Sequence, residues 1–366
     1  MKNENSLPSL GTHLPEFAID GQLLSVSEVG SGHLHRTFLG VWKVQEELVR
    51  FVHQEINTGV FPDLEILMRN TDVTLQHLKR CIEQEGTREI SYRVVPTRSG
   101  RLWFESDEGK AWRTFSYVEG GSVFRRCQNA PLAKEAGLLL GKFLRRMHSL
   151  NKQLEDTIPH FVALHRRFSV LEEAVEANSS GRLSRCNGLE KRILDHSETA
   201  RRLGKAIEEG SLPVWNCHND PKLENMLFDE RTRKGMCLVD LDTVMQSSVA
   251  YDFGDLLRSG AVISPEDEKN LASIQVNEDY LEALTAGLLQ ETGGILSDSE
   301  RSFMVEAPGA IALTLSARFL SDHLYGDKYF GIAYPDHNLE RAKAQFRVYQ
   351  AFCEVRERLR GLLSEG

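Results

Sequence analysis

The stretch HNDPKLENMLFDERTRKGMCLVDLDTV, residues 218–244, decides how the chain is interpreted. It holds Asp220, Asn225 five residues later, a turn, and then Asp240 after the apolar run MCLV. Phosphoryl transfer needs one carboxylate at the incoming hydroxyl group, and an amide oxygen and a second carboxylate on the Mg²⁺ that bridges the nucleotide phosphates. This segment supplies all three groups, so it predicts a catalytic base at Asp220 and a magnesium site at Asn225 and Asp240.

The spacing of these residues supports the same interpretation. Asp220 and Asn225 repeat the H-R-D-x-x-x-x-N spacing of kinase catalytic loops, and Asp240 follows across a short hairpin. Two alternatives stay open: His218 and Asp220 could merely cap a turn, or they could bind a hydrolytic metal together with Asp240 and Asp242. The second alternative leaves Asn225 without a role, so we favour phosphoryl transfer.

The letters D-F-G occur later, in AYDFGDLLRSG at residues 250–260. Asp252 lies 32 residues beyond Asp220 and is expected to open a helix, whereas the metal-binding carboxylate should end the hairpin directly after the catalytic loop. We therefore expect Asp252 to be structural, like His218, and to anchor the catalytic loop by accepting backbone hydrogen bonds from it. The alternative is an ordinary carboxylate at the start of a helix.

The flanking sequence divides into two parts. The first 120 residues contain the strand-like runs QLLSVSEV, HRTFLGVW, ELVRFVHQEI, ISYRVV, RLWF and AWRTFSYV. One helix is predicted from Phe61, with Pro62 in its first turn. After the glycine pair of EGGS, residues 119–122, helical periodicity prevails, apart from short strands at VWNCH, NMLFD and MCLVDLD. The sequence thus predicts an α+β chain with a sheet domain, residues 1–120, and a mainly helical domain, residues 121–366.

Composition limits the partners. The 366 residues include 44 basic and 53 acidic side chains, so the net charge of −9 would repel a nucleic acid but allows a compact polyphosphate with a divalent cation. No apolar run approaches the roughly 18 residues of a membrane span, and the polar start does not resemble a signal peptide. Six scattered cysteines without a C-x-x-C pair indicate reduced thiols. We expect a cytoplasmic protein without a membrane, nucleic acid or protein partner.

A glycine-containing break, VGSGHLHRTF at residues 29–38, lies between two predicted strands. Backbone N–H groups of such a turn can approach phosphates closely, because glycine has no side chain in the way. Without the residues around Asp220, an ordinary hairpin turn would be the better explanation of this break.

HNDPKLENMLFD followed by VDLDTV resembles the aminoglycoside phosphotransferase and choline kinase superfamily, which has a two-lobed, protein-kinase-like fold. Segments outside the catalytic loop are similar to N-acetylhexosamine 1-kinases, which phosphorylate the anomeric hydroxyl group of N-acetylated sugars with ATP. These segments are GSGHLHRTF, INTGVFPDLEILMRN, YDFGDLLRSGA, ARFLSDHLYGDKYF and YPDHNLERAKAQ. The resemblance implies a small antiparallel-sheet lobe, a larger helical lobe, and ATP with Mg²⁺.

The resemblance also implies residue roles. Asp220 takes the position of the catalytic base, Asn225 and Asp240 take the magnesium positions, and Asp242 is a second candidate at the metal. The phosphate-covering turn comprises Gly30, Ser31 and Gly32. Lys222 matches the lysine of the kinase catalytic loop and is expected to contact the transferred phosphoryl group. The third predicted strand departs from the pattern, because FVHQEI, residues 51–56, has no lysine to pair with the phosphates.

The two substrates need further contacts. The strand AWRTFSYV runs into EGGS, so we expect backbone groups of Tyr117, Val118 and Glu119 to bind the edge of adenine, with Val118 as the main anchor. The sugar should be held near Asp220 by residues 317–341, which are rich in polar and aromatic groups. The candidates are Arg318, Asp322, Tyr329 and His337, with His33 from the glycine turn. The alternative is a surface ion pair between Arg318 and Asp322, with the tyrosines in the core.

The sequence thus favours an ATP- and Mg²⁺-dependent sugar kinase. One alternative is a kinase of another small hydroxylated acceptor, such as an aminoglycoside or a choline-like amino alcohol. Another is an inactive nucleotide-binding scaffold, which the missing third-strand lysine would explain.

Overall fold

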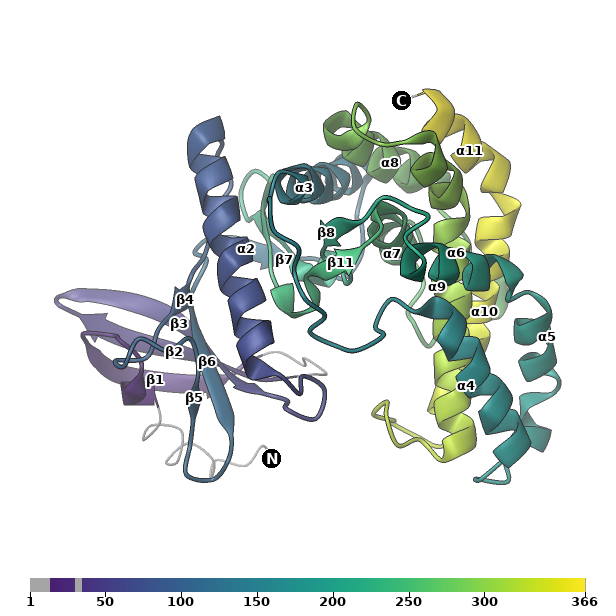
Figure 1. Cartoon of the computed structure of the whole chain (residues 1–366), viewed down its shortest axis with the longest axis horizontal. Helices are drawn as coiled ribbons and strands as arrows, with labels where there is room; N and C mark the ends of the chain where they lie inside the picture. Colours follow the sequence, from purple (N-terminus) through teal and green to yellow (C-terminus); the bar gives the residue numbers. More distant parts are fainter. Residues whose placement is uncertain (1–13, 30–34, 366) are drawn as a thin grey trace. The chain divides into compact units, whose positions relative to one another are not determined.

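The computed structural model of the chain describes residues 14–29 and 35–365 (Figure 1). It comprises two compact units, which are described separately. Unit 1 is the chain up to Gly120 together with Glu155–Pro159, and unit 2 is Gly121–Leu154 together with the chain from His160 onward. The division falls after Gly120, whose φ of +70° is a left-handed conformation that glycine adopts without strain.

Unit 1 is an antiparallel sheet with one long helix. The sheet has the order β1-β2-β3-β6-β4, with β5 also paired to β6. Its strands are β1 (Gln22–Glu28), β2 (Arg36–Val44), β3 (Glu47–Ile56), β4 (Val94–Val95), β5 (Phe104–Glu105) and β6 (Ala111–Ser116). The helix, α2 (Leu64–Glu85), is visible beside the sheet in Figure 1. The segment 155–159 belongs to this unit because Glu155 binds α2 through Arg69 and through a 2.7 Å bond from Asn70 to its carbonyl oxygen.

One face of the sheet holds an aromatic core. Phe38, Trp42, Phe51 and Trp112 pack there against the N-terminal segment that carries Phe17. His53 of β3 lies on the same face, within 3.3 Å of the Trp42 indole nitrogen and 2.8 Å of the Thr114 hydroxyl group. Burial lowers the pKa of His53 to about 4, so this side chain is neutral near pH 7.

The structure corrects details of the expected elements. The helix begins at Leu64 after the N-cap Asp63, whose carboxylate accepts a hydrogen bond from Ile66, so Pro62 precedes the helix and does not lie in its first turn. The runs ISYRVV and RLWF contribute only the two-residue strands β4 and β5. A further strand, β11 (Met245–Ser247), was not predicted, because a three-residue strand paired only with β8 has too little periodicity to detect.

Unit 2 is mainly helical. Its helices are α3 (Ala130–His148), α4 (Leu164–Ala177), α5 (Leu189–Asp195), α6 (Glu198–Glu208), α7 (Val249–Gly260), α8 (Glu278–Thr292), α9 (Asp298–Tyr325), α10 (His337–Glu354) and α11 (Arg356–Glu365). The strands β7 (Gly121–Val123), β9 (Met226–Asp229) and β10 (Gly235–Leu238) form one small sheet, and β8 (Trp215–Cys217) pairs with β11. An antiparallel-sheet unit followed by a helical unit confirms the predicted α+β class.

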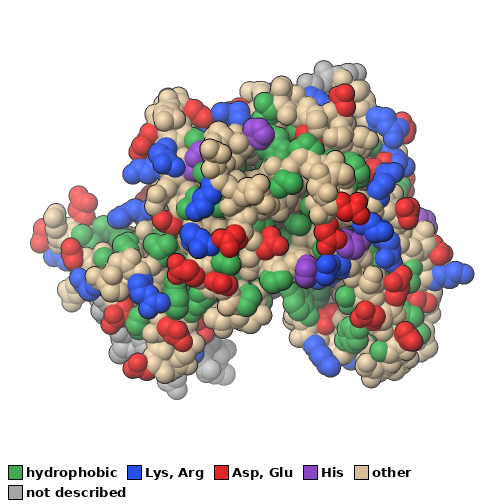
Figure 2. All heavy atoms as spheres, viewed as in Figure 1, with side chains coloured by type: hydrophobic (Ala, Val, Ile, Leu, Met, Phe, Trp, Pro, Cys, Tyr) green, Lys and Arg blue, Asp and Glu red, His purple; other side chains and the backbone are tan. Residues whose placement is uncertain are grey.

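Helix α9 forms the centre of unit 2. It starts with a capping box between Ser297 and Glu300, and Glu300 also accepts a 2.7 Å hydrogen bond from the Trp215 indole. By length and composition α9 could cross a membrane, but 78% of its most apolar window is buried inside the protein, as in the core helix of a globular domain. On the surface, acidic and basic side chains are interspersed over the face shown in Figure 2.

Candidate active site

The segment that carries Asp220 is fixed by the first turn of α7. Asp252, fully buried in that turn, accepts hydrogen bonds from the backbone N–H groups of His218 at 2.8 Å and of Asn219 at 2.7 Å. Burial raises the pKa of Asp252 to about 7, while these two hydrogen bonds favour the ionised form. Asp252 thus anchors the backbone just before Asp220, as the sequence predicted. It belongs to α7 and not to the hairpin that precedes Asp240.

The imidazole of His218 joins two parts of the site. Its Nδ1 lies 3.3 Å from the backbone nitrogen of Asp220, and its Nε2 lies 3.1 Å from the carbonyl oxygen of Val239, the residue before Asp240. Burial lowers the pKa of His218, which favours the neutral ring. The neutral tautomer with its proton on Nε2 satisfies both contacts, because Nδ1 then accepts and Nε2 donates.

Asn219 shapes the turn before Asp220. Its φ is +65°, a left-handed conformation that asparagine tolerates better than most residues. Its side-chain amide nitrogen lies 2.9 Å from the carbonyl oxygen of Thr243 and 3.2 Å from those of Cys217 and Met245. These bonds tie the turn to both strands of the β8–β11 pair and thereby fix the direction of the chain at Asp220.

Asp220 lies at the centre of a compact polar cluster. Its Oδ2 accepts hydrogen bonds from Lys222 Nζ and from Asn225 Nδ2, each at 2.9 Å. Burial lowers the pKa of Lys222, but the charges of nearby aspartates, Asp220 first, raise it above its usual value. Lys222 is therefore a permanent cation beside Asp220. Because both contacts use Oδ2, Oδ1 is the oxygen that can take a proton from an incoming hydroxyl group.

The residues proposed for Mg²⁺ fit that ion. Asn225 uses its amide nitrogen on Asp220, so its side-chain oxygen can act as a ligand. Asp240 is half-buried, in a left-handed conformation at the start of the turn Leu241–Thr243, and its charge acts on Lys222. The described residues contain no group of three or more His, Cys, Asp or Glu side chains that could hold a metal by themselves. Mg²⁺ is typically bound by one or two carboxylates together with substrate phosphates, and the side-chain oxygen of Asn225 and the carboxylate of Asp240 are donors of that kind.

Asp242 is a weaker candidate at the metal. Its exposed fraction is only 1%, whereas Asp240 keeps part of its surface open to solvent. A ligand of a nucleotide-bound cation must be reachable from the solvent side, so the structure favours Asp240 over Asp242.

Helix α7 contributes three further polar residues that the sequence interpretation missed. Tyr251, Asp255 and Arg258 are buried or half-buried, and Arg258 Nε lies 2.7 Å from Asp255 Oδ1. Burial raises the pKa of the Tyr251 phenol, and the charges of Asp255 and Asp220 raise it further. The D-x-x-D-x-x-R spacing from Asp252 to Arg258 places these charges on one helix face and could have identified them.

The structure brings two arginines to the neighbourhood of Tyr251. Arg167 of α4 and Arg318 of α9 both act on its phenol, and the Arg318 guanidinium lies over the rings of Tyr329, at 5.8 Å, and Phe330, at 5.3 Å. Burial lowers the pKa of Arg167, and the charge of Arg318 lowers it further, so the two cations repel each other. Arg318, which lies over Tyr329, and Asp220 therefore both act on the phenol of Tyr251.

Two of the residues predicted to bind the sugar, Asp322 and His337, make hydrogen bonds within unit 2, and their role at the sugar stays a prediction. The buried carboxylate of Asp322 accepts hydrogen bonds from the backbone of Lys328, Tyr329 and Phe330 and from the Asn338 amide. It therefore anchors the loop after α9 and forms no ion pair with Arg318, which also removes the surface-pair alternative.

His337 is the second of these residues. Its Nδ1 accepts a 3.1 Å hydrogen bond from the backbone of Ala333, and its Nε2 lies 3.1 Å from Asp267. Both ring nitrogens are thus used in closing the loop. Tyr329, by contrast, is 63% exposed, so it does not pack in the core as the alternative required.

In unit 1, the segment expected at adenine, residues 117–119, directly follows strand β6. Arg50 lies over the ring of Tyr117 at 4.3 Å, pairs with the carboxylate of Glu119, and accepts the N–H of Tyr117 on its carbonyl oxygen. The N–H of Tyr117 is therefore used within the sheet, which leaves Val118 and Glu119 as the candidates for the base edge. Gly30, Ser31, Gly32 and His33 lie outside the described residues.

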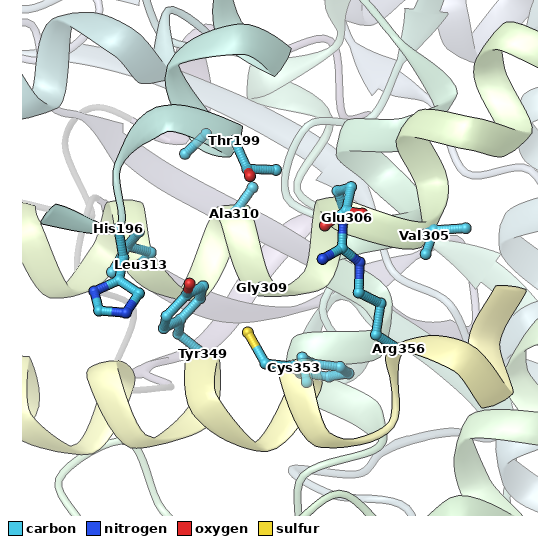
Figure 3. Close-up of a pocket in the computed structure, with 12 residues that line it drawn as sticks. His196, Thr199, Val305, Glu306, Gly309, Ala310, Leu313, Tyr349, Cys353 and Arg356 are labelled. Atoms are coloured by element: carbon cyan, nitrogen blue, oxygen red, sulfur yellow. Dashed lines mark hydrogen bonds and ion pairs between the residues drawn. The ribbon is translucent and has the colours of Figure 1, made fainter.

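A cavity of about 50 Å³ in unit 2 is separate from this cluster (Figure 3). It lies between α6, α9 and α10, and its lining includes His196, Tyr349 and Cys353, with the ion pair between Arg356 and Glu306 at one end. None of the residues predicted for the site lines it.

This chain is similar to phosphotransferases and small-molecule kinases, both in its sequence and in its fold. The family model described as "Phosphotransferase enzyme family" matches residues 98–288. Among solved structures, an aminoglycoside phosphotransferase from Alicyclobacillus acidocaldarius has a TM-score of 0.52 at 16% identity, covering 96% of both chains. A spectinomycin phosphotransferase in complex with ADP and spectinomycin has a TM-score of 0.51 at 15% identity, covering 95% of this chain and 99% of that one. An ethanolamine kinase from Plasmodium vivax has a TM-score of 0.50 at 10% identity, covering 88% and 82%. At these identities the structures establish the fold.

Proposed function

Because the chain belongs to the phosphotransferase enzyme family, we propose that it transfers the γ-phosphoryl group of ATP to the anomeric hydroxyl group of an N-acetylhexosamine. The product is a sugar 1-phosphate, with ADP as the second product. The geometry around Asp220 supports the transfer step, and the charges around Tyr251 support a neutral acceptor.

In the proposed reaction, Asp220 Oδ1 orients the anomeric hydroxyl group and accepts its proton. The sugar oxygen forms a bond to the γ-phosphorus, and the bond between that phosphorus and the bridging oxygen of ADP breaks. Lys222, held 2.9 Å from Asp220 Oδ2, lies close enough to stabilise the charge on the transferred group. Asn225 and Asp240 would hold Mg²⁺, which neutralises charge on the phosphates when it is bound.

The observation that favours a sugar is the pair of arginines near Tyr251. Arg167 and Arg318 repel each other already, so a cationic amino group placed directly beside them would add a further repulsion. The carboxylates of Asp220 and Asp255, whose charges act on Tyr251 in the opposite direction, would only offset that repulsion. A neutral N-acetylated sugar adds no charge, and its hydroxyl and acetamido oxygens can accept hydrogen bonds from guanidinium groups. The exposed ring of Tyr329 offers an apolar surface for the face of the sugar ring.

The charges of the site also distinguish the alternatives. Aminoglycosides and amino alcohols are cations near neutral pH, so the arginine pair disfavours them as acceptors. An inactive scaffold would have no need for Lys222 and Asn225 to contact Asp220, or for Asp240 to lie close enough for its charge to act on Lys222.

The acceptor class can be tested by following ATP consumption with Mg²⁺ over a panel of acceptors. The panel contains N-acetylglucosamine, N-acetylgalactosamine, glucose, galactose, choline, ethanolamine and one aminoglycoside. We expect turnover with the N-acetylated hexoses and little with the amines. Preferred turnover of an amine would overturn the sugar assignment, and no acceptor-dependent turnover at all would support the scaffold.

A further inference from the structure

The loop between α9 and α10, residues 326–336, carries Tyr329, the exposed ring proposed to pack against the sugar. The loop contains no helix or strand, and its residues Gly326, Asp327 and Asp336 have left-handed φ angles of +92°, +59° and +65°. A segment without regular hydrogen bonds of its own holds a side chain in one place only when other groups fix its backbone. The groups that fix this backbone therefore determine where Tyr329 lies.

A single buried carboxylate fixes the part of the loop around Tyr329. Asp322, in the last turn of α9, has an exposed fraction of 5%. Its Oδ1 accepts hydrogen bonds from the backbone N–H groups of Lys328 at 2.9 Å and of Tyr329 at 2.8 Å, and its Oδ2 accepts from that of Phe330 at 2.8 Å. Three successive N–H groups thus converge on one carboxylate, and hydrogen bonds to an ionised acceptor are stronger than those between neutral groups.

The same carboxylate is joined to the start of α10. Asn338, which is fully buried, donates from its amide nitrogen to Asp322 Oδ2 and to Asp327 Oδ1, each at 3.0 Å. Its amide oxygen accepts a 3.0 Å hydrogen bond from Arg341, which also donates at 2.9 Å to the carbonyl oxygen of Gly331. The loop is therefore tied to both of the helices that it connects.

The fixed backbone holds two aromatic rings beside Arg318. Arg318 lies four residues before Asp322 on α9, so both side chains leave the same side of the helix. The Arg318 guanidinium lies 5.8 Å from the ring of Tyr329 and 5.3 Å from that of Phe330, and the Phe330 ring lies 4.6 Å from that of Phe319. The hydrogen bonds from Asp322 to the backbone of residues 329 and 330 thus set where both rings meet the guanidinium.

We propose that Asp322 is a positioning residue for the acceptor, which it does not touch, and that it sets the affinity for the acceptor by holding Tyr329 in place. A carboxylate has about four lone-pair sites, and four hydrogen bonds from the protein already use those of Asp322. A ring that is held before the acceptor arrives loses less freedom on binding, which favours affinity. The inference rests on the proposed function, because it takes Tyr329 as a contact of the acceptor.

The test is a double-mutant cycle on the KM for N-acetylglucosamine. Asp322→Asn replaces an acceptor oxygen by a donor, so it should raise this KM by about threefold to tenfold, and by no more than Tyr329→Ala does. The KM for ATP should be nearly unchanged. In the Tyr329→Ala background, Asp322→Asn should have almost no further effect, because the residue through which it acts has been removed.

Glu300→Gln is the matched control. Glu300 is also a buried carboxylate of α9, at the other end of the helix, where it accepts hydrogen bonds from Ser297 and Trp215. Its substitution should leave the KM for the sugar unchanged. If Asp322→Asn does not fold, Asn338→Ala takes its place in the cycle. This variant keeps the carboxylate with its three backbone hydrogen bonds, so a smaller increase with the same dependence on Tyr329 is expected.

Two results of the cycle would overturn the inference. Equal increases of the KM for the sugar with and without the Tyr329 ring would show that Asp322 acts on the acceptor independently of Tyr329. An unchanged KM in both Asp322→Asn and Asn338→Ala would show that anchoring the loop does not affect the acceptor.

Amide hydrogen exchange tests the anchor without any acceptor. The amides of residues 328–330 should exchange slowly in the wild type and about tenfold faster or more in Asp322→Asn, with no such change in Glu300→Gln. Fast exchange in the wild type would overturn the inference even if the protein phosphorylates the sugar. Slow exchange without turnover of any N-acetylated hexose would instead contradict the proposed function, and the cycle would then be run with the acceptor that the panel identifies.

Discussion

The Nε2 atom of His218 lies 3.1 Å from the carbonyl oxygen of Val239, so one neutral imidazole connects the catalytic segment to the strand that ends at Asp240. The other ring nitrogen accepts from the backbone of Asp220. The distance between the candidate base and the candidate metal ligand therefore depends on a buried ring that neither substrate needs to touch. A change at His218 should disturb both functions together, whereas changes at Asp220 and Asp240 should separate them.

The first prediction concerns Asp220. Asp220→Asn should reduce kcat by about a hundredfold or more, because the amide cannot accept the hydroxyl proton. The affinity for Mg·ATP should be nearly unchanged, since the substitution preserves the shape of the side chain. Steady-state rates and calorimetric titration with Mg·ATP measure the two effects. A variant with wild-type turnover would exclude Asp220 as the base.

Asp240 should respond differently. Asp240→Asn removes a charged oxygen ligand, so Mg·ATP binding should weaken while the binding of ATP measured with EDTA should stay close to the wild-type value. The matched substitution Asp229→Asn, at the turn of the same β9–β10 hairpin, serves as the control. Equal Mg·ATP affinities in Asp240→Asn and the control would remove Asp240 from the metal site.

The pH dependence should reflect Asp252. Burial raises the pKa of its carboxyl group to about 7, and the ionised form accepts the N–H groups of both His218 and Asn219. As the pH falls through 7, protonation removes one acceptor and loosens the catalytic segment, so kcat should decline on the acid side. Asp252→Asn should have a low kcat that lacks this decline. An acid limb that is identical in the wild type and in Asp252→Asn would contradict this assignment.

Arg318 and Tyr329 should affect the acceptor selectively. Replacing each of them by Ala should raise the KM for the sugar by about tenfold or more and leave the KM for ATP nearly unchanged, because the lost contacts involve only the acceptor. Arg347→Ala, which removes a partly exposed arginine of α10 paired with Glu354, is the matched control. Equal increases of the KM for the sugar and of the KM for ATP would show that the acceptor binds elsewhere.

The ion pair of α7 gives a prediction on stability. Arg258 and Asp255 have exposed fractions of only 13% and 7% in their side chains, so Asp255→Ala leaves a buried guanidinium without its 2.7 Å partner. Breaking a buried pair in this way typically costs about 3–5 kcal/mol. Chemical denaturation should show a loss of this size for Asp255→Ala, and a much smaller loss for the double variant with Arg258→Met. A loss below about 1 kcal/mol in the single variant would mean that the pair is unimportant.

The polar cluster around Asp220 could be predicted from the sequence because its members lie close together in the chain. Asp220, Lys222 and Asn225 lie within six consecutive positions, and the same residues are in contact in the structure. The contacts of the residues proposed for the acceptor could be predicted only in part, because side chains in one segment make different contacts after folding. Arg318 faces Tyr329, whereas Asp322, four residues later, is used by the backbone of the following loop.

The features that the sequence did not predict depend on contacts between segments that are far apart in the chain. The pairing of Arg113 with Gln54 depends on the register between β3 and β6, 59 residues apart, which no local pattern specifies. The assignment of Glu155–Pro159 to unit 1 likewise depends on hydrogen bonds from α2. The strand β11 is too short to show a period of its own, and its existence follows from its pairing with β8.

The position of the transferred phosphate tests the central claim most directly. The protein would be incubated with ATP, Mg²⁺ and N-acetylglucosamine, and the product examined by proton–phosphorus correlation NMR. A phosphate that correlates with the anomeric proton of the sugar is the predicted result. A phosphate on any other carbon of the sugar, or inorganic phosphate as the only product, would contradict the assignment of this site as an anomeric sugar kinase.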